Sequence, residues 1–206
     1  MGTMAGPAEQ LFTPAEYLAF ERASETKHEY FSGRIYAMAG ASLAHNQVCS
    51  NLMRGLGNLL DGSPCRVLGS DMRVKVPATG LHTYPDAVVV CGKPILEDNE
   101  MDTLLNPKVI FEVLSRTTER YDRGEKFIHF QSVESLTNYV LVSQDRWRVE
   151  VFTRGDAGQW IVSRVEPPKR ELSLPSIGCT LDVEVLYEGV EIAQAAPLRD
   201  VTTEPR

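Results

Sequence analysis

The sequence has no long hydrophobic run, and this absence limits the classes of protein to which it can belong. No stretch approaches the roughly 20 continuous apolar residues that a membrane-spanning helix needs. The segment 1–6 has neither the basic start nor the apolar stretch of a secretory signal peptide. We therefore expect no membrane association and a cytoplasmic location.

Cysteine is also scarce. The four cysteines are scattered and include no Cys-x-x-Cys pair. This distribution is typical of buried, reduced thiols, which agrees with a reducing cytoplasm. The four positions are Cys49, Cys65, Cys91 and Cys179.

Positive charge is in the minority. The 21 lysines and arginines face 28 aspartates and glutamates, which gives a formal net charge of −7. This balance disfavours a general binder of polyanions, although a local basic patch can act against an acidic remainder. The chain also has no basic tail and no helix-turn-helix pattern, so neither the target nor the choice between DNA and RNA follows from the sequence.

What is present is the composition of a globular protein. A chain of 206 residues, 43% apolar and 24% charged, is long enough to bury a complete core. We expect a single domain over 1–206, with its core at 43–143, a helix and hairpin at 13–40 and further strands at 147–192. The end of the chain, from Gln194, is expected to fray.

Local patterns predict the order of the elements. Thr13, Pro14 and Glu16 form a capping-box pattern that starts the first helix. The expected helices are 13–24, 43–60 and 117–133. The expected strands are a hairpin at 27–38, strands at 65–76, 83–90, 108–115 and 138–143, a hairpin at 147–153 and 160–165, and a short strand at 181–186, with 93–107 as a surface loop or short helix.

From the second helix onward this order is α-β-β-β-α-β, which predicts an α/β fold with a mixed central sheet. The first three strands of this unit would form an antiparallel meander. The strand at 108–115, the helix after it and the strand at 138–143 would form a right-handed crossover.

Two carboxylates stand in apolar strands. Glu112 lies inside the run 107–115, where a carboxylate is unfavourable unless it is hydrogen-bonded, paired or bound to a metal. Asp86 follows Pro85 at the start of another apolar run, and antiparallel strands would bring the two acids together. Such oxygen ligands suit Mg²⁺ or Mn²⁺, which can activate a water molecule toward a phosphate. Lys126, two turns into the next helix, could orient the water or neutralise developing charge.

These residues and their order resemble the PD-(D/E)xK nuclease superfamily, and more closely the Uma2 family of endonucleases, formerly DUF820. The similarity covers most of the chain. Its motifs are Lys27-His28-Glu29-Tyr30, Gly33-Arg34-Ile35-Tyr36, Ser70-Asp71-Met72-Arg73, Tyr84-Pro85-Asp86, Phe111-Glu112-Val113-Leu114-Ser115, Asp122 with Lys126, and Asn138-Tyr139-Val140-Leu141-Val142.

The resemblance implies a restriction-endonuclease-like core, with an N-terminal helix and hairpin and a C-terminal β extension. It also implies metal-dependent hydrolysis of DNA phosphodiester bonds. Asp86 and Glu112 take the positions of the two motif acids and of the metal ligands. Leu114 stands where the textual motif has lysine, and the resemblance places Lys126 in that role. Glu29 and Asp71 match further acids of the family pattern.

Other residues are candidates for supporting roles. Groups that could sit behind the metal ligands are His45, Ser115 and Asp122. Residues that could contact phosphates are Arg66, Arg73 and Lys75 at the sheet edge, or Arg116, Arg120 and Arg123 beside the acids.

Alternatives remain for the residues and for the whole protein. Asp86 could cap a turn, Glu29 could pair with Arg34, and Lys126 could pair with Asp122 on a solvated face. The chain could be a binding or accessory module with little activity, acting as a homodimer, and a Lys126 that points away from the acids would favour this. The acids could also hold Ca²⁺ or Mg²⁺ structurally.

Overall fold

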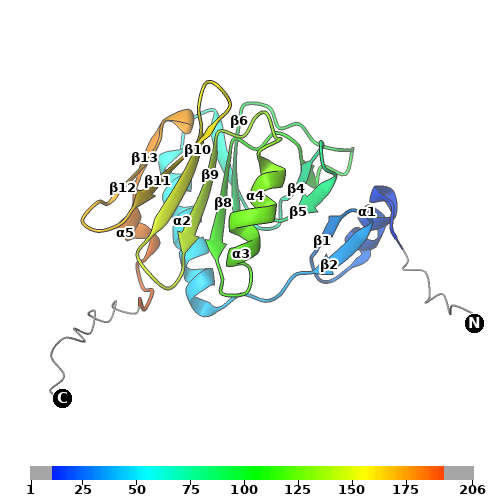
Figure 1. Ribbon diagram of the computed structural model, residues 1–206, viewed down its shortest axis with the longest axis horizontal. Coiled ribbons are helices and arrows are strands. Elements are labelled where there is room, and N and C mark those ends of the chain that lie inside the picture. Colours follow the sequence, from blue (N-terminus) through cyan, green and yellow to red (C-terminus); the bar gives the residue numbers. More distant parts are fainter. Residues whose placement is uncertain (1–10, 193–206) are drawn as a thin grey trace, which may run out of the picture.

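A six-stranded mixed sheet occupies the centre of the computed structural model, which describes residues 11–192 (Figure 1). The expectations for 1–6 and for the end from Gln194 lie outside these residues. The two central strands, β8 and β9, are parallel, and the other neighbours are antiparallel. In spatial order the strands are β11 (Trp160–Val165), β10 (Val149–Arg154), β9 (Asn138–Ser143), β8 (Val109–Leu114), β6 (Ala87–Cys91) and β3 (Cys65–Gly69).

Both faces of this sheet are covered. Successive side chains of a strand point to opposite faces, so the apolar runs of β6 and β8 supply both layers of core. One face packs against α2 (Leu43–Leu59), the two-stranded sheet of β12 (Glu171–Leu174) and β13 (Cys179–Asp182), and α5 (Val183–Leu186). A 3₁₀ turn, η2 (Pro175–Ile177), joins β12 to β13.

The other face packs against one helical segment and a second sheet. The segment consists of α3 (Glu119–Tyr121), a π-helical turn η1 (Asp122–Lys126) and α4 (Phe127–Phe130). The second sheet has five strands, in the order β2 (Arg34–Ala37), β1 (His28–Phe31), β5 (Leu81–Thr83), β4 (Arg73–Val76) and β7 (Thr103–Leu104).

The N-terminal elements form as their sequence signals predict. Helix α1 (Pro14–Ala23) begins with the predicted capping box between Thr13 and Glu16. The hairpin turn between β1 and β2 has positive φ at both Ser32 and Gly33, which matches the twist of the strands on either side.

Five expected elements need correction. The strands predicted at 65–76 and 83–90 are each broken and divided between the two sheets, and Pro85 interrupts the second because it cannot donate a hydrogen bond to a neighbouring strand. The segment 181–186 is strand only to Asp182, whose side chain caps α5. The helix expected to reach 133 ends at Phe130. The loop 93–107 contains β7, which pairs with β4.

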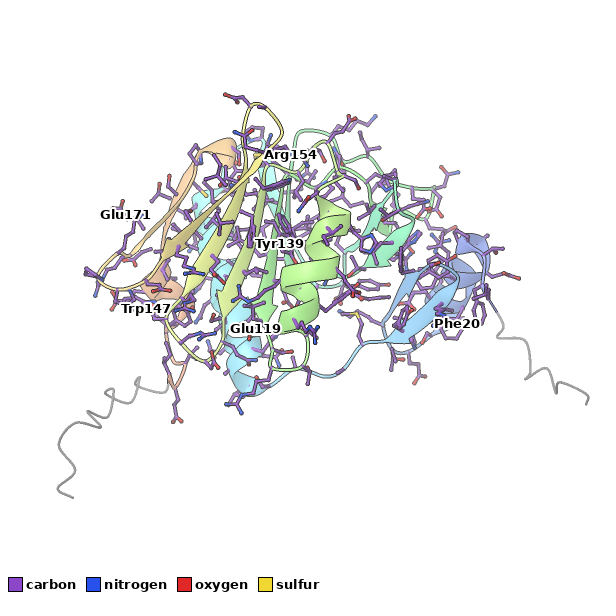
Figure 2. All side chains as sticks on the ribbon, viewed as in Figure 1. Phe20, Glu119, Tyr139, Trp147, Arg154 and Glu171 are labelled. Carbon is purple, nitrogen blue, oxygen red and sulfur yellow. A yellow bond between two sulfur atoms is a disulfide. The ribbon has the colours of Figure 1, made fainter. Side chains whose placement is uncertain are left out.

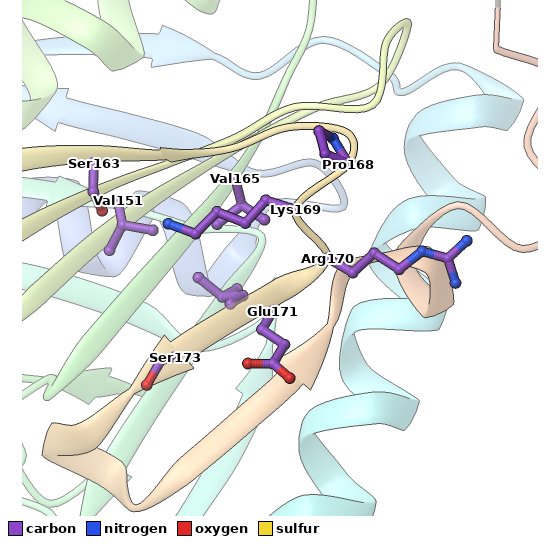
Figure 3. Close-up of a pocket in the computed structure, with 9 residues that line it drawn as sticks. Val151, Ser163, Val165, Pro168, Lys169, Arg170, Glu171 and Ser173 are labelled. Carbon is purple, nitrogen blue, oxygen red and sulfur yellow. The ribbon is translucent and has the colours of Figure 1, made fainter.

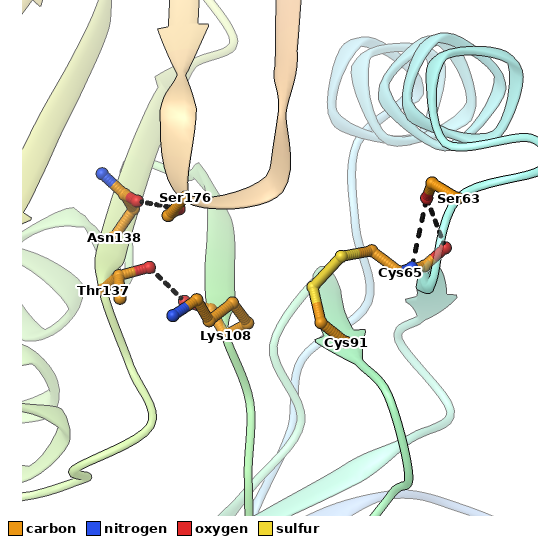
Figure 4. The surroundings of a disulfide bond; sticks show 7 residues. All are labelled: Ser63, Cys65, Cys91, Lys108, Thr137, Asn138 and Ser176. Carbon is orange, nitrogen blue, oxygen red and sulfur yellow. Dashed lines mark hydrogen bonds between the residues drawn. A yellow bond between two sulfur atoms is a disulfide. The ribbon is translucent and has the colours of Figure 1, made fainter.

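The expectation that all four cysteines are reduced is wrong for one pair. Cys65 and Cys91 form a disulfide between β3 and β6 (Figure 4). The antiparallel register places these two residues directly opposite each other, with their Cα atoms 3.9 Å apart. Cys49 and Cys179 are free thiols.

No helix between residues 11 and 192 has the length and apolar character that a membrane crossing requires.

Candidate metal and catalytic site

The two predicted acids lie on neighbouring strands. Ala87 pairs with Phe111 across the antiparallel β6–β8 ladder, so Asp86 lies across from Glu112. Glu112 is only 3% exposed, whereas Asp86 is partly exposed at the end of β6. The backbone N–H of Val113 donates to Asp86 Oδ2 at 2.7 Å, which holds that carboxylate beside β8.

Lys126 reaches Glu112 from the helical segment above the sheet. Its Nζ lies 2.8 Å from Glu112 Oε1, 3.4 Å from Glu29 Oε1 and 3.6 Å from Asp122 Oδ1. The pair of Lys126 and Asp122 is therefore buried with the acids and is not on a solvated helix face.

The π-helical turn and the aromatic residues around it position this lysine. A π turn has wider hydrogen bonding than an α-helix and often marks a functional site. The hydroxyl of Tyr139, a buried residue of β9 that lies behind the helical segment, donates to the backbone oxygen of Asp122 at 2.9 Å (Figure 2). Phe127 and Phe130, directly after the turn, stack on or tilt against the same tyrosine ring. The core thus fixes the segment that carries Lys126.

Glu29 comes to the site from the second sheet. Strand β1 pairs with β5 through Tyr30 and His82, and Thr83 on β5 donates a hydrogen bond to the Glu29 carboxylate. The hairpin register places Arg34 opposite Phe31 and not opposite Glu29. One carboxylate at the site therefore belongs to a part of the chain that precedes the core.

The cluster around Lys126 carries an excess of negative charge. Burial raises the pKa of Glu112 well above its ordinary value, and burial also raises the pKa of Asp122. Burial alone would lower the pKa of Lys126, but the carboxylates of Glu112, Glu29 and Asp122 outweigh it and raise that pKa. One ammonium cannot balance three carboxylates, and Asp86 lies close by. The oxygen donors and the excess charge fit a hard divalent cation.

His45 and Cys49 complete the surroundings of Asp86. His45, in the first turn of α2, places Nε2 3.3 Å from Asp86 Oδ2. Burial alone would lower the pKa of His45. The hydrogen bond to Asp86 and the negative charge of that carboxylate, with smaller contributions from Val113 and Asp122, together outweigh burial and raise this pKa. Cys49 lies one turn further on, with Sγ 3.5 Å from His45 Nδ1. Burial raises the pKa of the Cys49 thiol, with a further contribution from the Asp86 carboxylate.

Sequence reasoning selected His45 but missed Cys49. The signal that could have found it is the His-x-x-x-Cys spacing, which puts two donor side chains on one helix face. Within residues 11–192, His45, Cys49 and Asp86 form a group of three side chains whose metal-ligating atoms all lie within 4.8 Å of one another.

Several predicted residues lie elsewhere. Asp71 is 96% exposed and pairs with Lys27 on the surface. Arg73 is buried and contacts Thr103, Tyr84 and Asp102, so it does not face a substrate.

The remaining candidates are divided between paired and exposed positions. Arg123 is bound to Glu119 and Glu150, and Lys75 to Glu97. Arg66, Arg116 and Arg120 are exposed. Ser115, just beyond β8, bonds the hydroxyls of Thr117 and Thr118.

Two hollows differ in whether predicted residues line them, and neither is lined by the predicted acids. A groove of about 500 Å³ lies at the carboxyl ends of β8 and β9 and is lined by Ser42, Ser115 and Arg116, among others. A second pocket, of about 490 Å³, lies between β11 and β12 around Lys169 and contains none of the predicted site residues (Figure 3).

Comparison with known proteins places the chain in a family. The model of Uma2, described as "Putative restriction endonuclease", matches residues 14–184. The chain belongs to the Uma2 family. The protein slr1290 of Synechocystis sp., described as uncharacterized, is 36% identical to it over 178 residues, which cover 86% of this chain and 92% of the relative. A second Synechocystis protein, sll1609, is 31% identical over 163 residues, covering 79% of this chain and 92% of the relative.

A solved structure shares the fold of this Uma2 chain. It is a protein of Anabaena variabilis described as a "putative nuclease belonging to DUF820". The two match with a TM-score of 0.71 and 18% sequence identity, over 87% of this chain and 99% of that chain. The family and the mixed α/β fold predicted from the sequence are both confirmed.

Proposed function

We propose that this Uma2 protein is a metal-dependent endonuclease that hydrolyses phosphodiester bonds of DNA. The observation that carries the proposal is the contact of 2.8 Å between Lys126 and Glu112, with Asp86 across the strand pair. Two carboxylates and one ammonium are the groups that metal-assisted phosphodiester hydrolysis needs, and burial here keeps them in fixed relative positions.

Each residue has a distinct part in this proposal. Asp86 and Glu112 would hold Mg²⁺ or Mn²⁺, and such a cation supplies water activation and charge stabilisation when bound. The Val113 N–H and His45 orient Asp86. Lys126 orients the attacking water or balances charge on the phosphate, and Glu29 holds the lysine from the side of the second sheet.

The exposed arginines support a nucleic-acid substrate. Arg116 lies two residues after the end of β8 and lines the groove at the carboxyl ends of β8 and β9, and Arg120 lies in α3. Cations in this place would bind the phosphate backbone beside the acids. The overall negative charge makes the interaction depend on this local patch.

A cleavage assay tests the proposal. Plasmid and single-stranded DNA are incubated with Mg²⁺ or Mn²⁺ and with wild type, Asp86→Asn, Glu112→Gln or Lys126→Met. We expect metal-dependent nicking that falls by about 10²–10³-fold in each variant. Asp71→Asn is the matched control, because Asp71 is an exposed acid of the same motif series and should cut as wild type does.

Two outcomes would contradict the nuclease. Folded wild type that cuts no substrate with either metal would favour the binding or accessory module. Cutting that survives Asp86→Asn and Glu112→Gln would mean that these acids do not form the site. The position of Lys126 against Glu112 argues for the enzyme, since a lysine directed away from the acids would favour the binding module.

Compartment, assembly and domain extent belong to the same proposal. We place the enzyme in the cytoplasm, where its DNA substrate lies, as a single domain that forms a homodimer. The disulfide between Cys65 and Cys91 removes the support that reduced thiols would give. Thiol alkylation in intact cells and cell fractionation test the compartment, and a periplasmic protein would refute that part. Light scattering of the purified protein tests the assembly, and a monomer would refute the homodimer.

A further inference from the structure

Three side chains with different donor atoms converge beside the proposed catalytic acids. They supply an imidazole nitrogen, a thiol sulfur and a carboxylate oxygen, all within 4.8 Å of one another. His45 and Cys49 stand four residues apart on α2, and Asp86 enters from the start of β6. The two elements pack together in one core, so this convergence does not depend on a mobile loop.

One donor atom from each of the three side chains lies within 4.8 Å of the other two, a limit somewhat wider than the spacing in a formed coordination sphere. Ligand atoms 2.0 to 2.3 Å from a tetrahedral ion lie about 3.3–3.7 Å from each other. Cys49 Sγ is 3.5 Å from one ring nitrogen of His45, and Asp86 Oδ2 is 3.3 Å from the other. These two contacts use opposite ring nitrogens of His45, so only one of them can remain when an ion binds. The ion would bind one ring nitrogen and draw the third donor atom inward.

The donor types distinguish this set from the pair of Asp86 and Glu112. Two carboxylates favour Mg²⁺ or Mn²⁺, whereas nitrogen and sulfur ligands favour borderline cations such as Zn²⁺ or Co²⁺. Three protein ligands with one open position is also the arrangement of catalytic zinc sites. Asp86 belongs to both sets.

We propose that His45, Cys49 and Asp86 form a binding site for a borderline divalent cation of the Zn²⁺ or Co²⁺ class. The Cys49 thiol would release its proton to solvent as the sulfur–metal bond forms. This inference deepens the proposed function, on which it rests for the catalytic part of Asp86, while binding itself depends only on the three side chains. Its consequence is that Zn²⁺ or Co²⁺ competes with Mg²⁺ at Asp86.

Cobalt absorption tests the site without relying on activity. The full chain is freed of metal, titrated with Co²⁺, and followed in the near ultraviolet, where a thiolate ligand gives a charge-transfer band. We expect the band in wild type and in Cys179→Ala, the matched control at the other free thiol. We expect no band in Cys49→Ala, and affinity for Zn²⁺ lower by about tenfold or more in Cys49→Ala and His45→Gln.

The outcomes separate this inference from the nuclease. Wild type that binds Co²⁺ without a thiolate band, or binds no Co²⁺, overturns the site, and this result needs no variant to fold. A band that survives in Cys49→Ala also overturns it. A thiolate band in a protein that cuts no DNA keeps the site and refutes the nuclease. Cleavage with Mg²⁺ by a protein that gives no thiolate band supports the nuclease and refutes the site of His45, Cys49 and Asp86.

Discussion

Two buried clusters of charged side chains in this molecule differ in how their charges are matched. In the first, which we name the arginine cluster (Glu21, Arg73, Tyr84, Asp102), three guanidinium nitrogens of Arg73 meet Thr103, Tyr84 and Asp102. Tyr84 in turn donates to Glu21. In the second, the lysine cluster (Glu29, Glu112, Asp122, Lys126), one ammonium faces three carboxylates.

We infer from this difference that the arginine cluster is a structural network and that the lysine cluster belongs to the proposed site. The arginine cluster joins α1 to the second sheet, and neighbouring groups satisfy both of its carboxylates. Asp102 pairs with Arg22 as well as Arg73, and Glu21 accepts hydrogen bonds from Tyr84 and His28. The lysine cluster has three acids for one lysine, and burial raises the pKa values of Glu112 and Asp122, so ionising all three acids there is unfavourable. Charges buried in this way are unfavourable unless a cation or a proton relieves them, and such arrangements concentrate at active sites. The two clusters should therefore respond differently to mutation and to metal.

The largest effect is expected from Arg73→Met. This change removes the guanidinium from Tyr84 and leaves Asp102 with Arg22 alone. Breaking a buried pair lowers the free energy of unfolding by about 3–5 kcal/mol. Urea unfolding followed by circular dichroism measures it. Cleavage per folded molecule should stay at the wild-type level, and a folded variant that fails to cut would show that the arginine cluster takes part in function.

Metal should stabilise the lysine cluster and leave the arginine cluster unaffected. Mg²⁺ or Mn²⁺ at a hundred times its dissociation constant should raise the free energy of unfolding by about 2.7 kcal/mol, because it binds the folded chain alone. Thermal melts with and without metal measure this. The metal should still raise the free energy of unfolding of Arg73→Met, and it should not raise that of Asp86→Asn. An equal increment in Asp86→Asn would place the metal elsewhere.

Neutralising an acid of the lysine cluster should destabilise the protein far less than Arg73→Met does. Glu112→Gln keeps the shape of the side chain and removes one carboxylate from a cluster with excess negative charge. Without metal we expect the free energy of unfolding to stay within about 1 kcal/mol of wild type or to rise. Chemical denaturation in a chelator tests this, and a loss comparable with that of Arg73→Met would mean that the cluster is balanced.

The smallest effect concerns acid. The hydrogen bond from Arg22 holds the pKa of Asp102 well below its ordinary value of 3.8, although the side chain is partly exposed. A lowered folded pKa gives stability that is present above the unfolded value and lost as pH falls through the folded one. Asp102→Asn should thus cost about 1 kcal/mol at neutral pH, and the difference from wild type should shrink below about pH 4. A difference independent of pH would contradict the assignment.

The elements that could be predicted are those with local signals. The capping box at Thr13 and Glu16, the hairpin turn at Ser32 and Gly33, and the apolar runs of β6 and β8 each depend on neighbouring residues. Asp86 and Glu112 could be brought together because one antiparallel connection links their strands. Local patterns were therefore enough to predict that Asp86 and Glu112 lie close together.

What could not be predicted depends on packing between distant segments. Arg73 occupies the polar face of an alternating strand, but α1 and the loop before β8 cover that face, so the arginine is buried and not exposed. The disulfide of Cys65 and Cys91 follows from a strand register that their spacing does not reveal. The approach of Glu29 to Lys126 requires the pairing of β1 with β5, for which no local pattern exists.

The π-helical turn has a consequence for the phase of its helix. A π turn accommodates one more residue than an α-helical turn, which shifts every following side chain by about 100° around the axis. Lys126 is the last residue of the turn and lies four residues before Phe130, so these two side chains share a helix face. The rings of Phe127 and Phe130 pack against Tyr139. The packing of Phe127 and Phe130 against Tyr139 holds the lysine over the sheet. It can stay in place when the charges around it change, as they must when a cation or a phosphate arrives.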